Sequence, residues 1–92
     1  MGMLERKVEQ IEAKLLDAVN NADDHALFIA SYLHGHFDIV VSQTEQLANA
    51  NVEHLDEFMQ QSLQTAFDNH ELAADEQRQV FTLWQSLISA PN

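Results

Sequence analysis

Two side chains of this sequence are well suited to chemistry, Tyr32 and His36, which lie four positions apart and would share one face of a helix. An imidazole at such a position can act as a general base or hold a ligand. The other residues on that face, Ile29, Leu33 and Val40, are apolar, so a buried imidazole would need a hydrogen-bond partner. We favour a structural, buried histidine bonded to a carbonyl, a carboxylate or Tyr32. The alternative is a small-ligand or pH-responsive pocket at Tyr32 and His36.

A metal site is the next chemistry to consider, because His34 and His36 form a His-x-His pair. Residues two apart on a helix point roughly 200° away from each other, so these two imidazoles cannot hold one ion. His34 and Asp38 do share a face and could supply half of a zinc site, but the sequence does not indicate two further ligands. We expect no metal and no cofactor.

Nucleophilic catalysis has little support in the sequence. Ser31 would face away from His36, and two glycines are too few for a phosphate-binding loop or a nucleotide fingerprint. Cysteine is absent, which removes disulfides, thiolate ligands and cysteine nucleophiles. We therefore expect a protein that is not an enzyme and that has no catalytic residues.

The charge of the chain restricts its partners. Fifteen acidic residues against four basic ones give a formal net charge of −11. Such a surface repels nucleic acid and anionic membranes, and it favours a basic protein as partner, in a complex that weakens as salt rises. Mimicry of nucleic acid is a weaker third interpretation of the same excess of acid. The N-terminus resembles no signal peptide and no segment could span a membrane, so we expect a cytoplasmic protein.

The elements that must position these residues are helices. Two glycines and one proline, with apolar residues recurring every three or four positions, are typical of an all-α chain. The periodicity predicts a single domain over residues 1–92, a compact antiparallel four-helix bundle. The expected helices run roughly over 3–20, 24–48, 52–69 and 74–89.

The second of these helices is apolar around more than half of its circumference, and we expect it to be central and covered on several sides. Gly35 lies near the edge of its apolar arc and costs about 1 kcal/mol of helix propensity, which suggests a close crossing by another helix. Asp23 or Asp24 is the expected N-cap of this helix, and Asn51 that of the next one. Trp84 falls on an apolar face and is expected in the core.

Several short motifs resemble the YfcL-like family of small acidic bacterial proteins. They are Asp23-Asp24 with Leu27-Phe28, Ser31-Tyr32-Leu33, Gly35-His36, Gln61-Ser62-Leu63, Glu71-Leu72 and Trp84. The resemblance implies a compact protein of unknown function whose signature is Tyr32-Leu33-x-Gly35-His36, and it supplies no catalytic residue. This chain departs from the family pattern at His34, where arginine is usual, and at Ala73-Ala74, where Ser-Pro is usual.

Acidic charge without catalytic residues favours an interaction or accessory module. Its partner would be a basic protein that docks on acidic helix faces or beside the second helix. Homodimerisation is left open, because a small bundle with many aromatic residues gains stability by burying more surface.

Overall fold

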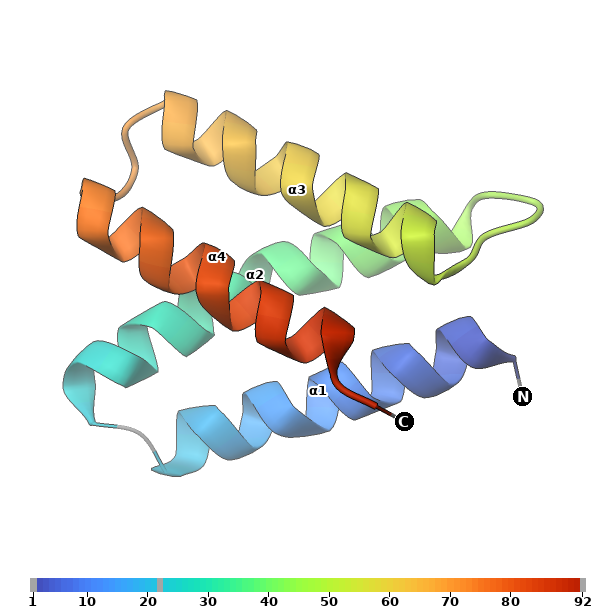
Figure 1. Cartoon of the computed structure of the whole chain (residues 1–92), viewed down its shortest axis with the longest axis horizontal. Coiled ribbons are helices and arrows are strands. Elements are labelled where there is room, and N and C mark those ends of the chain that lie inside the picture. Colours follow the sequence, from blue (N-terminus) through green and yellow to red (C-terminus); the bar gives the residue numbers. More distant parts are fainter. Residues whose placement is uncertain (1, 22, 92) are drawn as a thin grey trace.

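The computed structural model describes residues 2–21 and 23–91, and it confirms the all-α fold. Its helices are α1 (Met3–Asn21), α2 (Asp24–Glu45), α3 (Val52–Asp68) and α4 (Ala74–Ser89). Successive helices run in opposite directions, so both ends of the chain lie at the same end of the bundle (Figure 1). The helix α2 ends three residues before the predicted position 48, because the chain turns after Glu45 and Leu47 lies in that turn.

The helix ends are determined by local hydrogen bonds. Asp23 is the N-cap of α2, and its carboxylate accepts a hydrogen bond from the backbone N–H of Ala26 at 2.9 Å. Asn51 caps α3 as predicted, in a reciprocal pair with His54. The end of α3 is followed by His70 in the left-handed region, at φ 57°, where its backbone N–H donates to the carbonyl of Phe67. The backbone of His70 therefore satisfies one of the last carbonyls of this helix.

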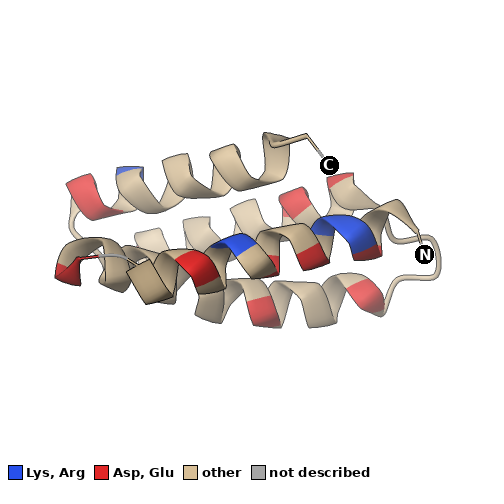
Figure 2. Ribbon diagram, turned by 90° about the horizontal axis from the view of Figure 1, so that it is seen from below, with Lys and Arg blue, Asp and Glu red and all other residues tan. Residues whose placement is uncertain are grey.

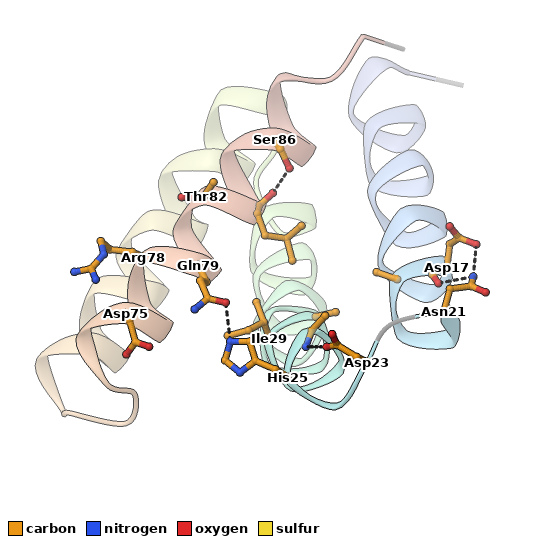
Figure 3. Close-up of a pocket in the computed structure, with 14 residues that line it drawn as sticks. Asp17, Asn21, Asp23, His25, Ile29, Asp75, Arg78, Gln79, Thr82 and Ser86 are labelled. Atoms are coloured by element: carbon orange, nitrogen blue, oxygen red, sulfur yellow. Dashed lines mark hydrogen bonds between the residues drawn. The ribbon is translucent and has the colours of Figure 1, made fainter.

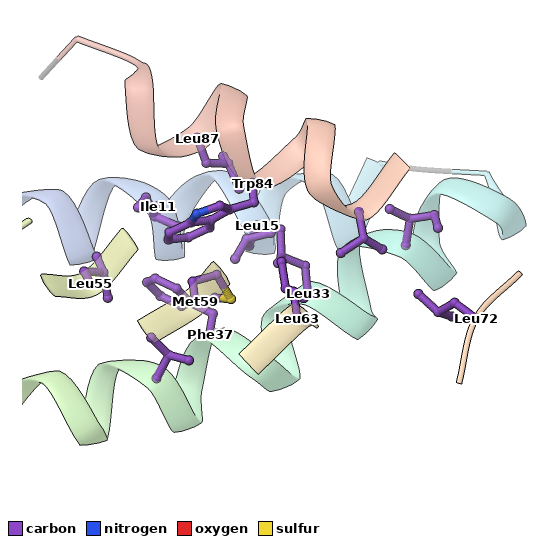
Figure 4. Packing of buried hydrophobic residues seen from close by; sticks show 13 residues of the cluster. Ile11, Leu15, Leu33, Phe37, Leu55, Met59, Leu63, Leu72, Trp84 and Leu87 are labelled. Carbon is purple, nitrogen blue, oxygen red and sulfur yellow. The ribbon is translucent and has the colours of Figure 1, made fainter. Parts of the chain in front are cut away.

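One core joins all of the helices (Figure 4). The helix α2 contacts each of the other three and contributes Leu33, Phe37 and Val40, all fully buried. Trp84 of α4 is also fully buried, as predicted, and its ring centroid lies 6.2 Å from that of Phe37. The indole N–H donates to the carboxylate of Asp56 on α3 at 2.8 Å, so the one polar atom of this side chain is satisfied.

The outer face of α2 is less covered than the sequence predicted. Phe28 is 44% exposed and Ile39 is 60% exposed, although α2 is central to the packing. A Cβ placed on Gly35 would have no described neighbouring atom within 4 Å. The predicted close helix crossing at Gly35 is therefore wrong within the described chain, because this residue faces outward.

Charge is distributed unevenly over the helices (Figure 2). The bases Arg6, Lys7 and Lys14 lie on α1 and Arg78 lies on α4, whereas α2 and α3 carry acids without any lysine or arginine. Among the helices that the structure describes, none is both long enough and apolar enough to cross a lipid bilayer.

Candidate functional site

Tyr32 and His36 lie side by side on α2, with their ring centroids 4.8 Å apart. The Nδ1 atom of His36 lies 2.8 Å from the hydroxyl oxygen of Ser62, so this hydrogen bond joins α2 to α3. His36 therefore has a hydrogen-bond partner, as predicted, but the partner is a serine hydroxyl. The expectation of a buried histidine is wrong, because the side chain lies at the edge of the helix contact and is only half-buried.

The hydroxyl of Tyr32 donates a hydrogen bond to the carboxylate of Glu71 at 3.0 Å. Partial burial of the ring, the hydrogen bond to Glu71 and the negative charge of Glu71 together raise the pKa of Tyr32 to about 12. The phenol is thus held in its neutral form at ordinary pH. In that form it is a hydrogen-bond donor that ties α2 to the connection between α3 and α4.

A hollow of about 340 Å³ lies beside His36. Its lining comes from α2, from α3 and from the segment that follows α3, and includes Phe58, Ser62 and Glu71. Tyr32 lies outside this lining. This hollow therefore includes His36 without Tyr32, whereas the alternative interpretation of the sequence placed both residues at one pocket. Gly35, the third residue of the signature, is exposed on the outer surface of α2.

His34 occupies a position between two carboxylates. Its Nε2 atom lies 3.1 Å from Glu12 of α1, and its Nδ1 atom lies 3.8 Å from Asp38, one turn further along α2. Potential ligand atoms of these three residues all lie within 4.8 Å of one another. The structure thus adds Glu12 to the pair that the sequence indicated.

The two carboxylates approach different nitrogens of the His34 ring. A protonated imidazole satisfies this arrangement by donating one N–H to each side. A single ion would use only one of the two ring nitrogens, and the exposed Asp38 carboxylate would have to move closer to the nitrogen that Glu12 approaches. The contact of His34 with Glu12 joins α2 to α1.

A groove of about 890 Å³ lies between the C-terminal half of α1, the start of α2 and α4 (Figure 3). Its floor is apolar and includes Ile29, Ala30 and Leu83. A hydrogen bond of 2.7 Å between His25 and Gln79 ties α2 to α4 within the groove.

The charged residues at the groove are mostly acidic. Asp17 of α1, Asp23 at the cap of α2 and Asp75 of α4 line it together with one base, Arg78. The carboxylates come from three separate parts of the chain and lie around an apolar floor (Figure 3). This combination of charge and apolar surface can bind a cationic amphipathic ligand.

Sequence reasoning missed this groove. Its lining includes the small side chains of Ala18 on α1 and of Ala26 and Ala30 on α2, which leave space between these helices and α4. A cluster of alanines on facing helices was a visible signal, but it could be interpreted only once the helix pairing was known. Of the acidic residues around the groove, Asp23 was predicted only as a helix cap, and the sequence did not indicate that Asp17 and Asp75 would lie around the same groove.

The fold is that of a small acidic all-helical bundle. The chain belongs to the family described as YfcL protein, whose model matches residues 5–89. It is similar to the "Uncharacterized protein YfcL" of Escherichia coli (strain K12), with 26% identity over 85 residues that cover 88% of this chain and 92% of the relative. No solved structure matches the chain. Neither the family description nor the name of the relative states an activity, and the function of the protein is unknown.

Proposed function

We propose that the protein is a non-enzymatic interaction module that binds a basic, amphipathic helical segment of a partner protein. The segment docks in the groove between α1, α2 and α4. The observation that carries this proposal is the groove of about 890 Å³ with an apolar floor and three carboxylates around it.

The proposed occupant follows from the shape and charge of the groove. An amphipathic helix buries one apolar stripe and leaves its flanks polar, so a stripe of leucine or isoleucine would cover Ile29 and Leu83. Lysine or arginine on the flanks would lie near Asp17 and Asp75. The net charge of −11 adds long-range attraction that speeds the encounter with such a partner and that salt screens.

A non-catalytic role is consistent with the contacts of the signature residues. His36 is bonded to Ser62 and Tyr32 to Glu71, in each case joining two parts of the fold. We also propose that the protein acts in the cytoplasm. Its lack of cysteine is consistent with that location, because small secreted domains are commonly stabilised by disulfides.

Binding to a defined probe tests the proposal. The probe is a synthetic amphipathic peptide of roughly 18 residues, about five helical turns, with leucine on one face and lysine on the other. Its control replaces every lysine with glutamate. We expect the lysine peptide alone to bind, with amide shifts in an NMR titration at Ala26, Ile29 and Leu83. If amide signals of other residues shifted while these three did not, the peptide would bind outside the groove, which would contradict the proposal.

Two charge-reversal variants distinguish binding in the groove from a general effect of surface charge on peptide binding. Asp17→Lys lies in the groove, whereas Glu57→Lys lies on an exposed position of α3 outside the groove lining. We expect Asp17→Lys to weaken peptide binding by about tenfold, and Glu57→Lys by much less. An equal loss in both variants, with circular dichroism unchanged, would show that only the total charge matters.

A further inference from the structure

Two carboxylates and one imidazole meet at the edge of the contact between α1 and α2. Glu12 of α1 and Asp38 of α2 approach the ring of His34 at 3.1 and 3.8 Å. One potential ligand atom from each of the three residues lies within 4.8 Å of the other two. None of the three residues lines the groove proposed above, so this cluster is a separate place in the fold and does not depend on what binds in the groove.

The cluster lacks a lysine or arginine to balance its carboxylates. Within residues 2–21 and 23–91, no lysine or arginine forms an ion pair with Glu12 or Asp38. A neutral imidazole carries a single N–H, so one of its two nitrogens presents a lone pair to a carboxylate. Acceptor groups that face one another in this way repel, and a cation placed between them removes the repulsion. That cation can be a proton on the ring or a metal ion.

The spacing of Glu12 and His34 already suits a metal ion. Zinc lies about 2.0–2.2 Å from its nitrogen and oxygen ligands, so two neighbouring ligand atoms are about 3–3.6 Å apart. The Oε1 atom of Glu12 lies 3.1 Å from the Nε2 atom of His34, which is within that range. Because the two residues belong to different helices, an ion bound to both would fasten α1 to α2.

Asp38 can supply a third ligand after a small movement. Two ligands four residues apart on a helix lie on the same face and can hold one zinc ion, as His34 and Asp38 are spaced to do. The side chain of Asp38 is 60% exposed, so it can rotate toward the nitrogen that Glu12 approaches. The movement is short, because ligand atoms of the three residues already lie within 4.8 Å of one another.

The types of ligand indicate which metal would bind. One imidazole with two carboxylates suits zinc and other divalent transition metals. Calcium and magnesium instead prefer sites built from oxygen atoms alone. The net charge of −11 attracts every divalent cation to the surface, so it is the imidazole of His34 that gives this cluster its preference for zinc.

We propose that Glu12, His34 and Asp38 form a zinc-binding site that joins α1 to α2. The Nε2 atom of His34 and one oxygen of each carboxylate bind the ion, and water takes the fourth position. A histidine ligand is neutral, so zinc displaces any proton on Nε2 into the solvent.

Isothermal calorimetry of the untagged protein with a zinc salt tests the site. His34→Gln and Glu12→Gln each remove one ligand, and two control variants make matched changes elsewhere. His70→Asn removes a different exposed imidazole, at a positive φ of 57° that asparagine tolerates. Glu57→Gln removes one exposed carboxylate from α3. Circular dichroism verifies that each variant folds.

We expect one zinc ion to bind per wild-type chain. The zinc dissociation constant should rise by about tenfold or more in His34→Gln and in Glu12→Gln, and by less than about twofold in the two controls. Binding that does not saturate by about 1 mM zinc would overturn the proposal. Equal losses in His34→Gln and His70→Asn would also overturn it, because zinc would then bind to histidines in general.

NMR of the imidazole nitrogens identifies the ligand in the wild-type protein, without any substitution. We expect zinc to shift the ring nitrogen signals of His34 and to leave those of the other four histidines nearly unchanged. Magnesium at the same concentration provides the control for ionic strength and should shift none of them. Zinc-induced shifts at another histidine, with His34 unchanged, would overturn the proposed site.

Discussion

The two faces of α2 differ more than their composition suggests. On the inward face Leu33, Phe37 and Val40 are fully buried beside Trp84, whereas on the outward face Phe28 and Ile39 are exposed, with Gly35 between them. Both faces carry large apolar side chains in the sequence. The comparison shows that the apolar residues of a helix do not by themselves tell which of its faces is buried. Some large apolar side chains stay exposed in the folded chain.

The largest expected difference between the faces is in the cost of losing an aromatic ring. Phe37→Ala empties a fully buried site and should lower the free energy of unfolding by about 3–5 kcal/mol. Phe28→Ala makes the same chemical change at a side chain that is 44% exposed, and should cost less than about 1 kcal/mol. Urea unfolding followed by the fluorescence of Trp84 measures both, at a protein concentration low enough to keep the chain monomeric. Similar losses would mean that the outer face is covered.

Two aspartates extend the comparison to polar groups. Asp56 accepts the indole N–H of the buried Trp84, so Asp56→Ala leaves that donor unsatisfied and should cost about 1–3 kcal/mol. Asp38 is exposed on α2, and Asp38→Ala should change stability by no more than about 0.5 kcal/mol. Thermal unfolding monitored by circular dichroism distinguishes the two. An Asp56→Ala variant as stable as the wild type would show that the indole finds another acceptor, such as water.

Substitution of Gly35 should act in the opposite direction. Because a Cβ at this position meets no described atom within 4 Å, Gly35→Ala should raise the stability of the monomer by about 0.5–1 kcal/mol through helix propensity. Chemical denaturation of the dilute protein provides the measurement. A loss of stability would show that a side chain is not tolerated at this position.

The smallest expected effect is the alkaline titration of Tyr32, which lies at the border of the two faces. It is the single tyrosine of the chain, so the ultraviolet absorbance of tyrosinate reports it directly, and we expect a pKa near 12. The folded protein holds this proton more tightly than the unfolded chain, whose tyrosine titrates near 10. The associated stability is therefore complete below pH 10 and is lost as the pH rises toward 12.

A substitution at Glu71 separates the causes of this shift. Glu71→Gln removes the negative charge, and we expect the pKa of Tyr32 to fall yet stay above 10, because burial of the ring is the largest cause. A pKa at the ordinary value in this variant would assign the whole shift to Glu71.

The sequence predicted those features that depend on neighbours along the chain. Periodicity located the helices, and the side-chain chemistry of Asp23 and Asn51 predicted where two of them begin. Features that depend on helix pairing were missed or misjudged. The contacts of His34 with Glu12 and of Trp84 with Asp56 join separate helices, and the spacing of residues within one helix holds no information about them.

The error at Gly35 has a related cause. The cost of glycine in a helix was correctly judged, and a close approach was inferred from it, but the sequence does not say from which side a neighbour comes. The same limit applies to His36, whose position on an apolar face did not reveal that it lies at the edge of the contact with Ser62.

The ends of the chain are held together by side chains of α1. Lys7 and Gln10 donate hydrogen bonds to the backbone carbonyls of Ala90 and Pro91, directly after α4. Since the chain begins and finishes at the same end of the bundle, a force applied to its termini would peel α1 and α4 apart from that end (Figure 1). Under such a force the contacts between the helices break one after another, so each has to resist the force alone. The protein should therefore yield mechanically at low force, with the contacts of Lys7 and Gln10 the first to open.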